Sequence, residues 1–277
     1  MTALIFACIL FVVGYLAGLL GALTGLGGGF IITPVLVLLF KVDIHYAMGA
    51  SLIAVIVTST SGSAAYLKDF VNLRIGMFLE TAAVTGALIG ALLVAKIPTH
   101  LIAIIFGVVL LVSAYLTVRH KEDLEPIPTS HPWAIELQLD GNYLSGQGIK
   151  PYRVQHVPLA WSVMGCAGVL SGLLGIGSGV LKVMAMDQIM HLPYKVSTTT
   201  SNFMIGMTAA VSAGIYFAHG YINPSLSFPI ILGIIPGVMT GSKILVKAST
   251  RFLRILFSCV IAILACQMIY KGVVGEL

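Results

Sequence analysis

Long runs of apolar residues alternate along this chain with short clusters of polar and charged residues. Eight of the runs are long enough to cross a bilayer as helices, which takes about 20 apolar residues. Two shorter runs, residues 30–40 and 180–190, would rise only about 17 Å as helices, roughly half of the hydrocarbon core. The runs are continuous, whereas strands of a membrane barrel alternate apolar and polar residues. The pattern predicts an all-α integral membrane protein of about ten helical segments; the long runs are residues 4–23, 47–67, 75–95, 101–118, 157–174, 196–218, 226–246 and 253–270.

The second half of the chain repeats the first at an offset of 150 residues. The glycine-rich stretch that starts at Gly25 (GLGGG) recurs at Gly175 (GIGSG), and 175 − 25 = 150. Identical residues at this offset extend to both sides of the glycines, and after a slip of one residue Gly86 matches Gly237. A repeat of this length indicates a duplicated half-protein rather than the unit of a solenoid. We therefore predict two inverted-topology repeats of five segments each, with glycine-broken short helices.

Residues 119–155 differ from the rest of the chain and divide it into three parts. They hold a charged run at residues 121–125 and a polar turn at residues 140–142. Polar and apolar residues alternate over residues 133–140, which predicts a strand and, with the turn, a small hairpin. The predicted organisation is a first transmembrane repeat at 1–118, a cytoplasmic linker at 119–155 and a second transmembrane repeat at 156–277.

The positions of lysine and arginine predict how the repeats are oriented, because cytoplasmic loops are enriched in these residues. If each half crosses five times, the halves are inverted, and eleven basic residues fall on the linker side against three on the other. If the short segments do not cross, the halves run parallel and the split is seven against seven. The rule favours the inverted arrangement. The eleven residues are Lys68, Arg74, Arg119, Lys121, Lys150, Arg153, Lys195, Lys243, Lys247, Arg251 and Arg254, and the three are Lys41, Lys96 and Lys271.

The composition excludes a soluble protein. Hydrophobic residues make up 58% of the chain and charged residues 9%, with a mean hydropathy of +1.03, whereas soluble domains carry about 25% charged residues. The four cysteines lie scattered in apolar runs and are interpreted as small core side chains. The histidines show no metal-site spacing and no catalytic set stands out, so we expect no metal, no cofactor and no enzyme. The basic residues are spread over short loops, which argues against nucleic acid as a partner.

The two glycine-rich stretches are the strongest candidates for a binding site. Glycine lets the backbone leave a helix, adopt a positive φ and approach a ligand closely. A helix that starts at such a break presents unpaired N–H groups and the positive end of its dipole, which suits an anion. Glycine-interrupted short helices at matching positions are typical of transporter binding sites. Close packing is the alternative, favoured for Gly86 and Gly237, but it does not need three consecutive glycines. The candidates are Gly25, Gly27, Gly28, Gly29, Gly175, Gly177, Ser178 and Gly179.

Several polar residues inside the apolar runs are further candidates. Lys182 would add positive charge to an anion site; the alternatives are that it reaches the surface or pairs with Asp187. Glu80 is a candidate for carrying a coupling proton, against a pairing with Arg74 near the surface. Hydroxyl-rich runs could line a polar path, or each hydroxyl could bond to its own helix. These runs include Ser51 with residues 58–61, and Thr198, Thr199, Thr200, Ser201 and Asn202.

Three motifs resemble the TauE/SafE sulfite exporter family of bacterial and archaeal permeases: GVLSGLLGIGSG at residues 168–179, KVSTTTSN at residues 195–202 and GLGGGFIITP at residues 25–34. Thr33, inside the last motif, joins the substrate-binding candidates. The resemblance covers essentially the whole chain. It implies export or exchange of small sulfur-containing or organic anions, such as sulfite, sulfonates or sulfoacetate, across the cytoplasmic membrane. Two positions depart from the family pattern: Ser178 replaces a glycine, and Met184 stands where the first half has Pro34.

We therefore predict a secondary transporter that moves a small anion by alternating access, in the direction of export. A passive anion channel is the alternative, and an intramembrane enzyme is disfavoured because no convergent acid, base or metal site is found. The expected partners are the small anion, the lipid bilayer and a coupling proton or sodium ion, and a homo-oligomer is left open.

Overall fold

The computed structural model describes residues 3–24, 27–66, 71–119, 130–145, 148–245 and 250–275. Within these residues, seven helices are long and apolar enough to cross a membrane. Residues Gly29–Phe40 and Ser258–Val274 form shorter apolar helical stretches. The prediction of an all-α integral membrane protein is confirmed.

The described residues contain ten helical segments outside the linker, five on each side of it. The first set is α1 (Ala3–Thr24), α2 (Gly29–Phe40), α3 (Ile44–Tyr66), α4 (Leu73–Leu93) with a 3₁₀ turn η1 (Val94–Lys96), and α5 (Thr99–Arg119). The second set is α7 (Val157–Leu174), α8 (Gly179–Met184) with a π-helical turn η2 (Ala185–Ile189), α9 (Tyr194–Ala218), α10 (Pro224–Leu245) and α11 (Thr250–Val274). Each predicted segment is present, with ends within a few residues of those expected from the apolar runs.

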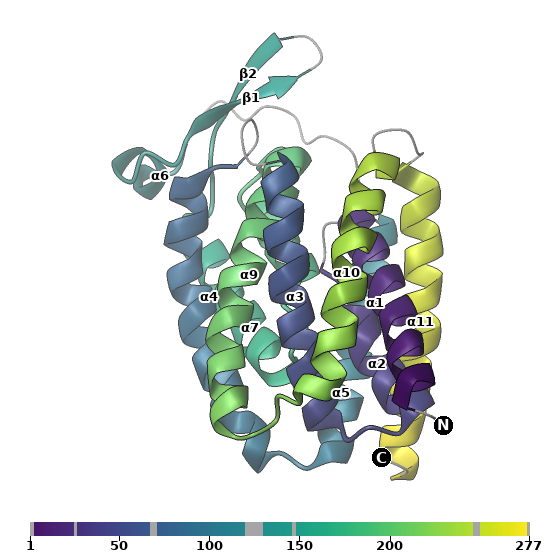
Figure 1. The fold of residues 1–277 in the computed structure, drawn as a ribbon. Helices are drawn as coiled ribbons and strands as arrows, with labels where there is room; N and C mark the ends of the chain where they lie inside the picture. Colours follow the sequence, from purple (N-terminus) through teal and green to yellow (C-terminus); the bar gives the residue numbers. More distant parts are fainter. Residues whose placement is uncertain are drawn as a thin grey trace.

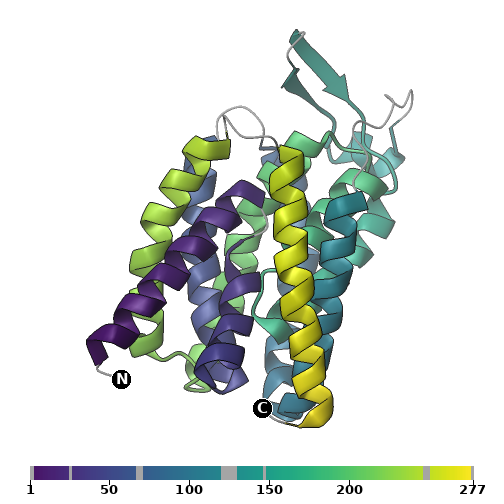
Figure 2. The same cartoon turned by 90° about the vertical axis from the view of Figure 1, so that its right-hand side faces the viewer.

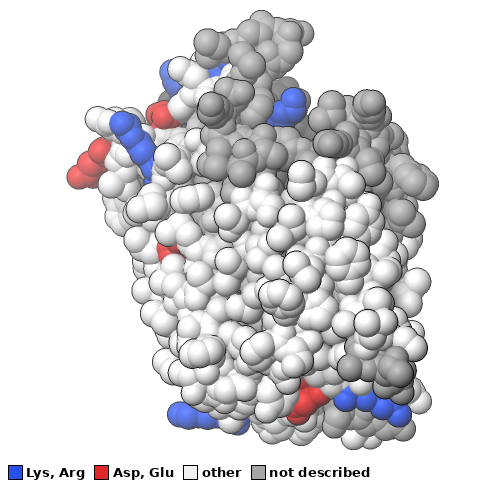
Figure 3. All heavy atoms as spheres, in the orientation of Figure 1, with Lys and Arg blue, Asp and Glu red and all other residues white. Residues whose placement is uncertain are grey.

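The helices form one bundle whose two ends differ. Figure 1 shows the linker at one end, called the linker end below, and both chain termini at the other, called the terminal end. Figure 2, turned by 90°, shows the same division. On the face shown in Figure 3, the coloured charged side chains gather towards the two ends, and the belt between them is almost entirely uncharged. This distribution fits a protein whose middle lies in lipid, where charged side chains are costly.

The long helices pack in pairs that join the two halves of the chain: α1 with α10, α4 with α7, α5 with α11 and α3 with α9. Glycines permit the close approach. A Cβ added at Gly86 would lie 2.2 Å from the carbonyl oxygen of Gly165, and one added at Gly237 would lie 2.2 Å from that of Tyr15. The packing role predicted for these two glycines is confirmed. The contacts are related by the sequence offset, since 165 − 15 = 150 and 237 − 86 = 151. The inverted repeat itself stays a prediction, which these contacts support.

The two short helices lead to opposite ends of the bundle. α2 leads to α3, where the ring of His45 stacks on Tyr221, just beyond α9, at a centroid distance of 4.8 Å. Figure 1 places this connection at the terminal end. α8 and η2 lead to Met190, whose carbonyl oxygen accepts a hydrogen bond from the backbone N–H of Gln155 in the linker (3.2 Å). Lys195 therefore lies at the linker end, where the five-crossing alternative places it. The orientation in the membrane stays a prediction.

The strand predicted at residues 133–140 is wrong. This region contains helix α6 (Pro132–Glu136), and the hairpin follows it as β1 (Gly141–Ser145) and β2 (Gly148–Tyr152), paired antiparallel from Gly141 with Tyr152 to Ser145 with Gly148. Pro132 favours a helix start, and the Nδ1 atom of His131 accepts a hydrogen bond from the N–H of Trp133. This cap overrides the alternation of polar and apolar residues that suggested a strand.

Asn72 joins the linker to α4. Its Oδ1 atom caps the helix by accepting a hydrogen bond from the N–H of Ile75 (3.1 Å). Its Nδ2 atom donates to the carbonyl oxygen of Leu139 (3.1 Å) and to the hydroxyl of Tyr152 (2.6 Å). Apolar side chains of the linker complete the contact, so the linker covers this end of α4, α7, η2 and α9. The linker side chains are Ala134, Leu139, Tyr152 and Val154, and they pack with Ile75, Leu79, Met186, Met190 and Val196.

The four cysteines are exposed rather than buried, so their interpretation as core side chains is wrong. Cys8, Cys166, Cys259 and Cys266 are all free and lie on the surface of the bundle. Hydrophobic residues need not point inward here, because lipid tails are as apolar as the protein interior.

Candidate functional site

Each glycine-rich stretch breaks the backbone between two helices. Gly27 has φ +82° and Gly177 has φ +75°, while Gly175, which ends α7, has φ +66°. Residues with a Cβ rarely adopt this left-handed region, so glycine favours the passage from α1 into α2 and from α7 into α8, where Ser178 also has a positive φ. The positive φ predicted at Gly27 and Gly177 is confirmed. Gly25 lies outside the described residues.

The two breaks meet at mid-height in the bundle. A Cβ added at Gly27 would lie 3.8 Å from both Ile205 Cγ2 and Val55 Cγ1, and one added at Gly177 would lie 2.7 and 3.1 Å from the same two atoms. Val55 and Ile205 each stand eleven residues past the first residue of their helices, α3 and α9. A Cβ added at Gly29 would lie 3.5 Å from the carbonyl oxygen of Gly175. The structure thus brings together the two stretches that the sequence singled out.

Two serines fasten the short helices to the long ones. Ser51 Oγ lies 3.2 Å from the carbonyl oxygen of Gly29 and 2.9 Å from that of Gly175, and it can donate its hydrogen to either. Ser201 donates to the carbonyl oxygen of Gly179 (3.3 Å). In both halves the serine stands 22 residues after the first residue of the short helix. Ser51 and Ser201 therefore position the breaks.

Ser178, which departs from the family pattern, is accommodated by a hydrogen bond. It has φ 42° and stands at the N-cap position of α8, but its hydroxyl donates to the carbonyl oxygen of Ala167 (2.7 Å) and not to α8. In the first half Gly28 faces Ala17, where an added Cβ would lie 3.0 Å from the carbonyl oxygen. The two contacts are again 150 residues apart. Ser178 therefore bonds to α7 at this position, where the first half has a bare glycine.

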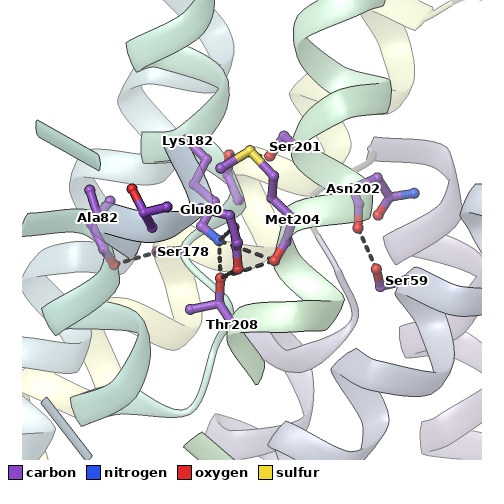
Figure 4. Close-up of polar contacts among 12 residues, drawn as sticks. Ser59, Glu80, Ala82, Ser178, Lys182, Ser201, Asn202, Met204 and Thr208 are labelled. Atoms are coloured by element: carbon purple, nitrogen blue, oxygen red, sulfur yellow. Dashed lines mark hydrogen bonds and ion pairs between the residues drawn. The ribbon is translucent and has the colours of Figure 1, made fainter. Parts of the chain in front are cut away.

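Lys182 lies one helical turn past the start of α8 and forms an ion pair with Glu80 of α4. The Nζ atom is 3.5 Å from Glu80 Oε2, and the two residues are 0% and 3% exposed. Nζ also donates to the hydroxyl of Thr208 and to the carbonyl oxygen of Met204, the latter at 3.3 Å. The Thr208 hydroxyl lies 2.5 Å from Glu80 Oε1. Figure 4 shows the ammonium group between these partners.

This pairing decides against one alternative for Lys182 and corrects the expectation for Glu80. Lys182 does not reach the surface; it is fully buried, with Glu80 as its ionic partner. The expected pairing of Glu80 with Arg74 is wrong, because Arg74 instead donates to Gln138 Oε1 (2.8 Å) at the base of the linker. The partner of Glu80 was sought nearby in the sequence, whereas α4 and α8 meet only in the fold.

The hydroxyl-rich runs divide into two groups. The threonines mostly bond to their own helix: Thr58 donates to the carbonyl oxygen of Ala54 (2.7 Å) and Thr199 to that of Lys195 (2.7 Å). The others join helices. Ser59 donates to the carbonyl oxygen of Asn202 (Figure 4), and Thr200 accepts a hydrogen bond from the N–H of Asn72 (3.2 Å). Their contacts in this structure are those of helix packing and do not bring Thr199, Thr200 or Asn202 to the glycine breaks.

Two buried threonines, Thr33 and Thr208, are the remaining polar residues considered for the site. Thr33 in α2 is fully buried, and its hydroxyl has no hydrogen-bond partner among the described residues. Thr208 was missed as a candidate, although a signal existed. It stands 150 residues after Thr58, and each hydroxyl bonds to the carbonyl oxygen four residues earlier in its helix. The binding roles of all the candidates stay predictions.

The chain is similar to membrane transporters along nearly its full length. The family described as Sulfite exporter TauE/SafE matches residues 10–268. The probable membrane transporter protein YunE of Bacillus subtilis (strain 168) is 29% identical over 274 residues, which cover 96% of this chain and 98% of that protein. The probable membrane transporter protein MJ0441 of Methanocaldococcus jannaschii is 25% identical over 284 residues, which cover 94% of each chain. No solved structure gives a significant match.

Proposed function

Because the chain belongs to the TauE/SafE sulfite exporter family and is a membrane transporter, we propose that it is a secondary transporter that exports a small anion by alternating access. The observation that carries the proposal is the ammonium group of Lys182, fully buried one turn past the start of α8. A charge at this depth is costly unless it meets a counter-charge. In this arrangement Glu80 supplies the counter-charge, and a bound anion would take its place beside Lys182.

The substrate class follows from the chemistry of this point and from the family. A small oxyanion would pair with Lys182 and approach the N–H groups at the starts of the short helices, where glycine permits close contact. The family description names sulfite. Sulfite, sulfonates and sulfoacetate are therefore the first anions to test, with carboxylates as the comparison.

Alternating access requires two arrangements of one bundle around the same site. Residues 27–34 and 171–180 are all buried, so the breaks are shielded from solvent in this arrangement. The short helices lead from the breaks to opposite ends, and helix pairs on the two sides make matching contacts. These features support two inverted repeats that rock against each other and open the breaks to each end in turn.

Flux measurements in proteoliposomes test the proposal. The purified protein is reconstituted, and uptake of labelled sulfite, methanesulfonate, sulfoacetate and acetate is followed. A carrier gives saturable uptake and counterflow, in which external labelled anion exchanges for internal unlabelled anion, whereas a passive channel gives neither. We expect both signatures for at least one sulfur anion. Uptake that does not saturate, or no uptake of any of these anions, would contradict the proposal.

The substitution Lys182→Met tests the observation on which the proposal rests. A hydrogen bond to a charged group contributes up to about 3 kcal/mol, so we expect flux to fall about 100-fold. Lys182→Arg should retain part of the flux. Lys96→Met, which removes an exposed lysine at the end of η1, is the matched control and should transport like the wild type. Normal flux through monodisperse Lys182→Met would show that this lysine is not in the site.

A further inference from the structure

The buried ion pair joins α4 of the first repeat to α8 of the second, and neither residue has a charged counterpart in the other repeat. At the offset of 150, Ile32 is the counterpart of Lys182, and at the offset of 151 that relates α4 to α10, Ile231 is the counterpart of Glu80. Thr208 does have a matching residue, Thr58, with the same hydrogen bond to its own helix. The fold therefore accepts apolar side chains at the equivalent positions, and helix packing by itself does not explain why charges stand at these two.

A buried ion pair is also weak evidence for stability. Removing two charges from water costs about as much as their attraction returns, and replacing both by apolar side chains is often neutral. Removing one partner, by contrast, leaves a charge without compensation and is strongly unfavourable. Any step that draws Lys182 away from Glu80 must therefore neutralise the carboxylate at the same time.

We propose that Glu80 takes up one proton each time an anion binds Lys182, so that the anion and the proton cross the membrane together. This inference rests on the proposed function and adds the coupling ion to it. Glu80 Oε2 is the carboxylate oxygen nearest to the ammonium group, and it has no hydrogen-bond partner among the described residues. It is the atom at which the proton is held.

The charges balance in both states that cross the membrane. In the empty carrier the carboxylate of Glu80 and the ammonium of Lys182 sum to zero. In the loaded carrier the proton sits on Glu80, Lys182 stays an ammonium ion, and a monovalent anion replaces the carboxylate as its partner, so the sum is again zero. The two mixed states, anion without proton and proton without anion, bury a net charge and are disfavoured. Transport is then electroneutral, with one proton for each monovalent anion.

The other described titratable groups near Glu80 do not take over this role. Lys182 is the charged group that faces it from α8, while α9 presents Met204 and Thr208, which do not titrate. α7 meets α4 through glycines such as Gly165 and Gly168. The remaining groups lie towards the linker end: Arg74, bound to Gln138; Tyr152, bound to Asn72; Asp140, which accepts a hydrogen bond from the N–H of Val154; and Asp187, a buried acid on η2.

Two assays on the same proteoliposomes test the coupling. Methanesulfonate is the probe, because its acid is strong and it carries no proton of its own. The first assay measures counterflow of the labelled anion, and the second measures acidification of the lumen when the anion enters down its gradient. For the wild type we expect counterflow, acidification with uptake, and an uptake rate that does not change when a potassium diffusion potential is imposed.

Glu80→Gln keeps the shape of the side chain and mimics the protonated state. The anion can still pair with Lys182, so counterflow should stay within about two-fold of the wild type. The empty carrier would have to return with the charge of Lys182 uncompensated, so net uptake should fall about ten-fold or more, without acidification. Glu80→Asp retains a carboxyl group and should retain acidification. Asp187→Asn, at the other buried acid, is the matched control and should acidify like the wild type.

The outcomes separate the two proposals. Anion uptake by the wild type without acidification, or acidification that persists in Glu80→Gln, would overturn the coupling and leave the anion transporter intact. If acidification is lost in Asp187→Asn but kept in Glu80→Gln, the proton is carried by Asp187 and not by Glu80. That result would also overturn the proposed coupling. Failure of the wild type in both assays, and with every anion of the flux panel, would overturn the proposed function together with the coupling.

Discussion

The two glycine breaks share part of their backbone design but differ at the helix start, where Gly28 has φ −75° and Ser178 has φ 42°, and in their chemistry. Each has a positive-φ glycine at the same position, Gly27 or Gly177, and each is tied by a serine to a long helix. The first break leads into α2, a 12-residue helix with apolar Ile32, whereas the second leads into α8, a 6-residue helix that carries Lys182. The positive-φ glycine and the serine that holds the short helix are thus present twice and the charge once. The proposal assigns ligand binding to the feature that the two halves do not share.

The ends of the short helices differ as well. α2 contains Pro34 and stays α-helical to Phe40, whereas Met184 stands at the equivalent position of the second half and is followed by the π-helical turn η2. π-helical turns occur frequently at functional sites. The departure at Met184 therefore coincides with a local change in the helix on the side that also carries the charge.

Alanine at the two positive-φ glycines should give the largest effects and should separate the two breaks. At Gly177 the new Cβ would strain the backbone and lie 2.7 Å from Ile205 Cγ2, whereas at Gly27 the nearest atoms are 3.8 Å away and only the strain remains. We expect Gly177→Ala to lower the free energy of unfolding by about 3 kcal/mol and to abolish counterflow. Gly27→Ala should cost about 1–2 kcal/mol and keep reduced counterflow. Thermal unfolding in detergent and counterflow measure the two effects.

Gly86→Ala is the control for these variants, because it disturbs packing between α4 and α7 without touching the breaks. It should lower stability, while the folded fraction binds the transported anion as tightly as the wild type. If Gly27→Ala and Gly177→Ala also bind the anion with unchanged affinity, the breaks are structural and the site lies elsewhere.

Replacing the ion pair by apolar residues should remove transport while sparing the fold. The double substitution Lys182→Ile with Glu80→Ile places at each position the residue type of its counterpart in the other repeat, Ile32 and Ile231. We expect a free energy of unfolding within about 2 kcal/mol of the wild type, because such replacements are often neutral, and no measurable counterflow. Unfolding and counterflow on the same preparation provide the measurement. Counterflow near the wild-type rate would show that the site is made of backbone alone.

The smallest effect is expected at the linker, which has no counterpart in the repeat. Tyr152→Phe removes the hydrogen bond with Asn72 and should weaken docking by about 1 kcal/mol. Hydrogen exchange at the first turn of α4 should speed up accordingly. An unchanged exchange rate would mean that the apolar contacts alone hold the linker in place.

The same residue predicts an alkaline limit to docking. Burial raises the pKa of the Tyr152 phenol, so the neutral form fits the docked state better than the phenolate. This contribution is complete below the ordinary pKa of 10.0 and is lost as the pH rises through the raised value. The protection of the α4 amides, measured relative to their intrinsic exchange rate at each pH, should therefore fall in that range in the wild type. Tyr152→Phe, which cannot ionise, should not show this fall.

The helices could be predicted from the sequence because a segment that crosses the lipid must be both apolar and helical, so each apolar run marks one helix. Even the short segments were located, since the glycines at Gly27 and Gly177 mark where a helix cannot continue. The cysteines were placed wrongly because the rule that apolar side chains point inward belongs to water and not to lipid. The strand predicted at residues 133–140 was wrong because Pro132 and the His131 cap start a short helix there. These local signals outweigh the alternation of polar and apolar residues over the whole segment.

The candidate site could be predicted only where the two halves agree. Gly27 and Gly177, and Ser51 and Ser201, were found because each supports the other at the offset of 150. Lys182 and Glu80 were noticed separately, but their pairing was not, since it joins two residues that lack such a match and lie 102 positions apart (182 − 80). Thr208, between them, was overlooked because its own match, Thr58, lies beside no charge in the sequence.

One hydroxyl group at the centre of the bundle has a consequence for motion. Ser51 has a single hydrogen and lies within hydrogen-bond distance of two acceptors, one at each break: the carbonyl oxygens of Gly29 and Gly175. Moving that hydrogen from one acceptor to the other exchanges one bond for another of the same kind, so the net change in energy is small. The hydroxyl therefore has two settings of similar energy. In the proposed rocking of the bundle, this serine would let the two breaks shift relative to each other without the loss of a hydrogen bond.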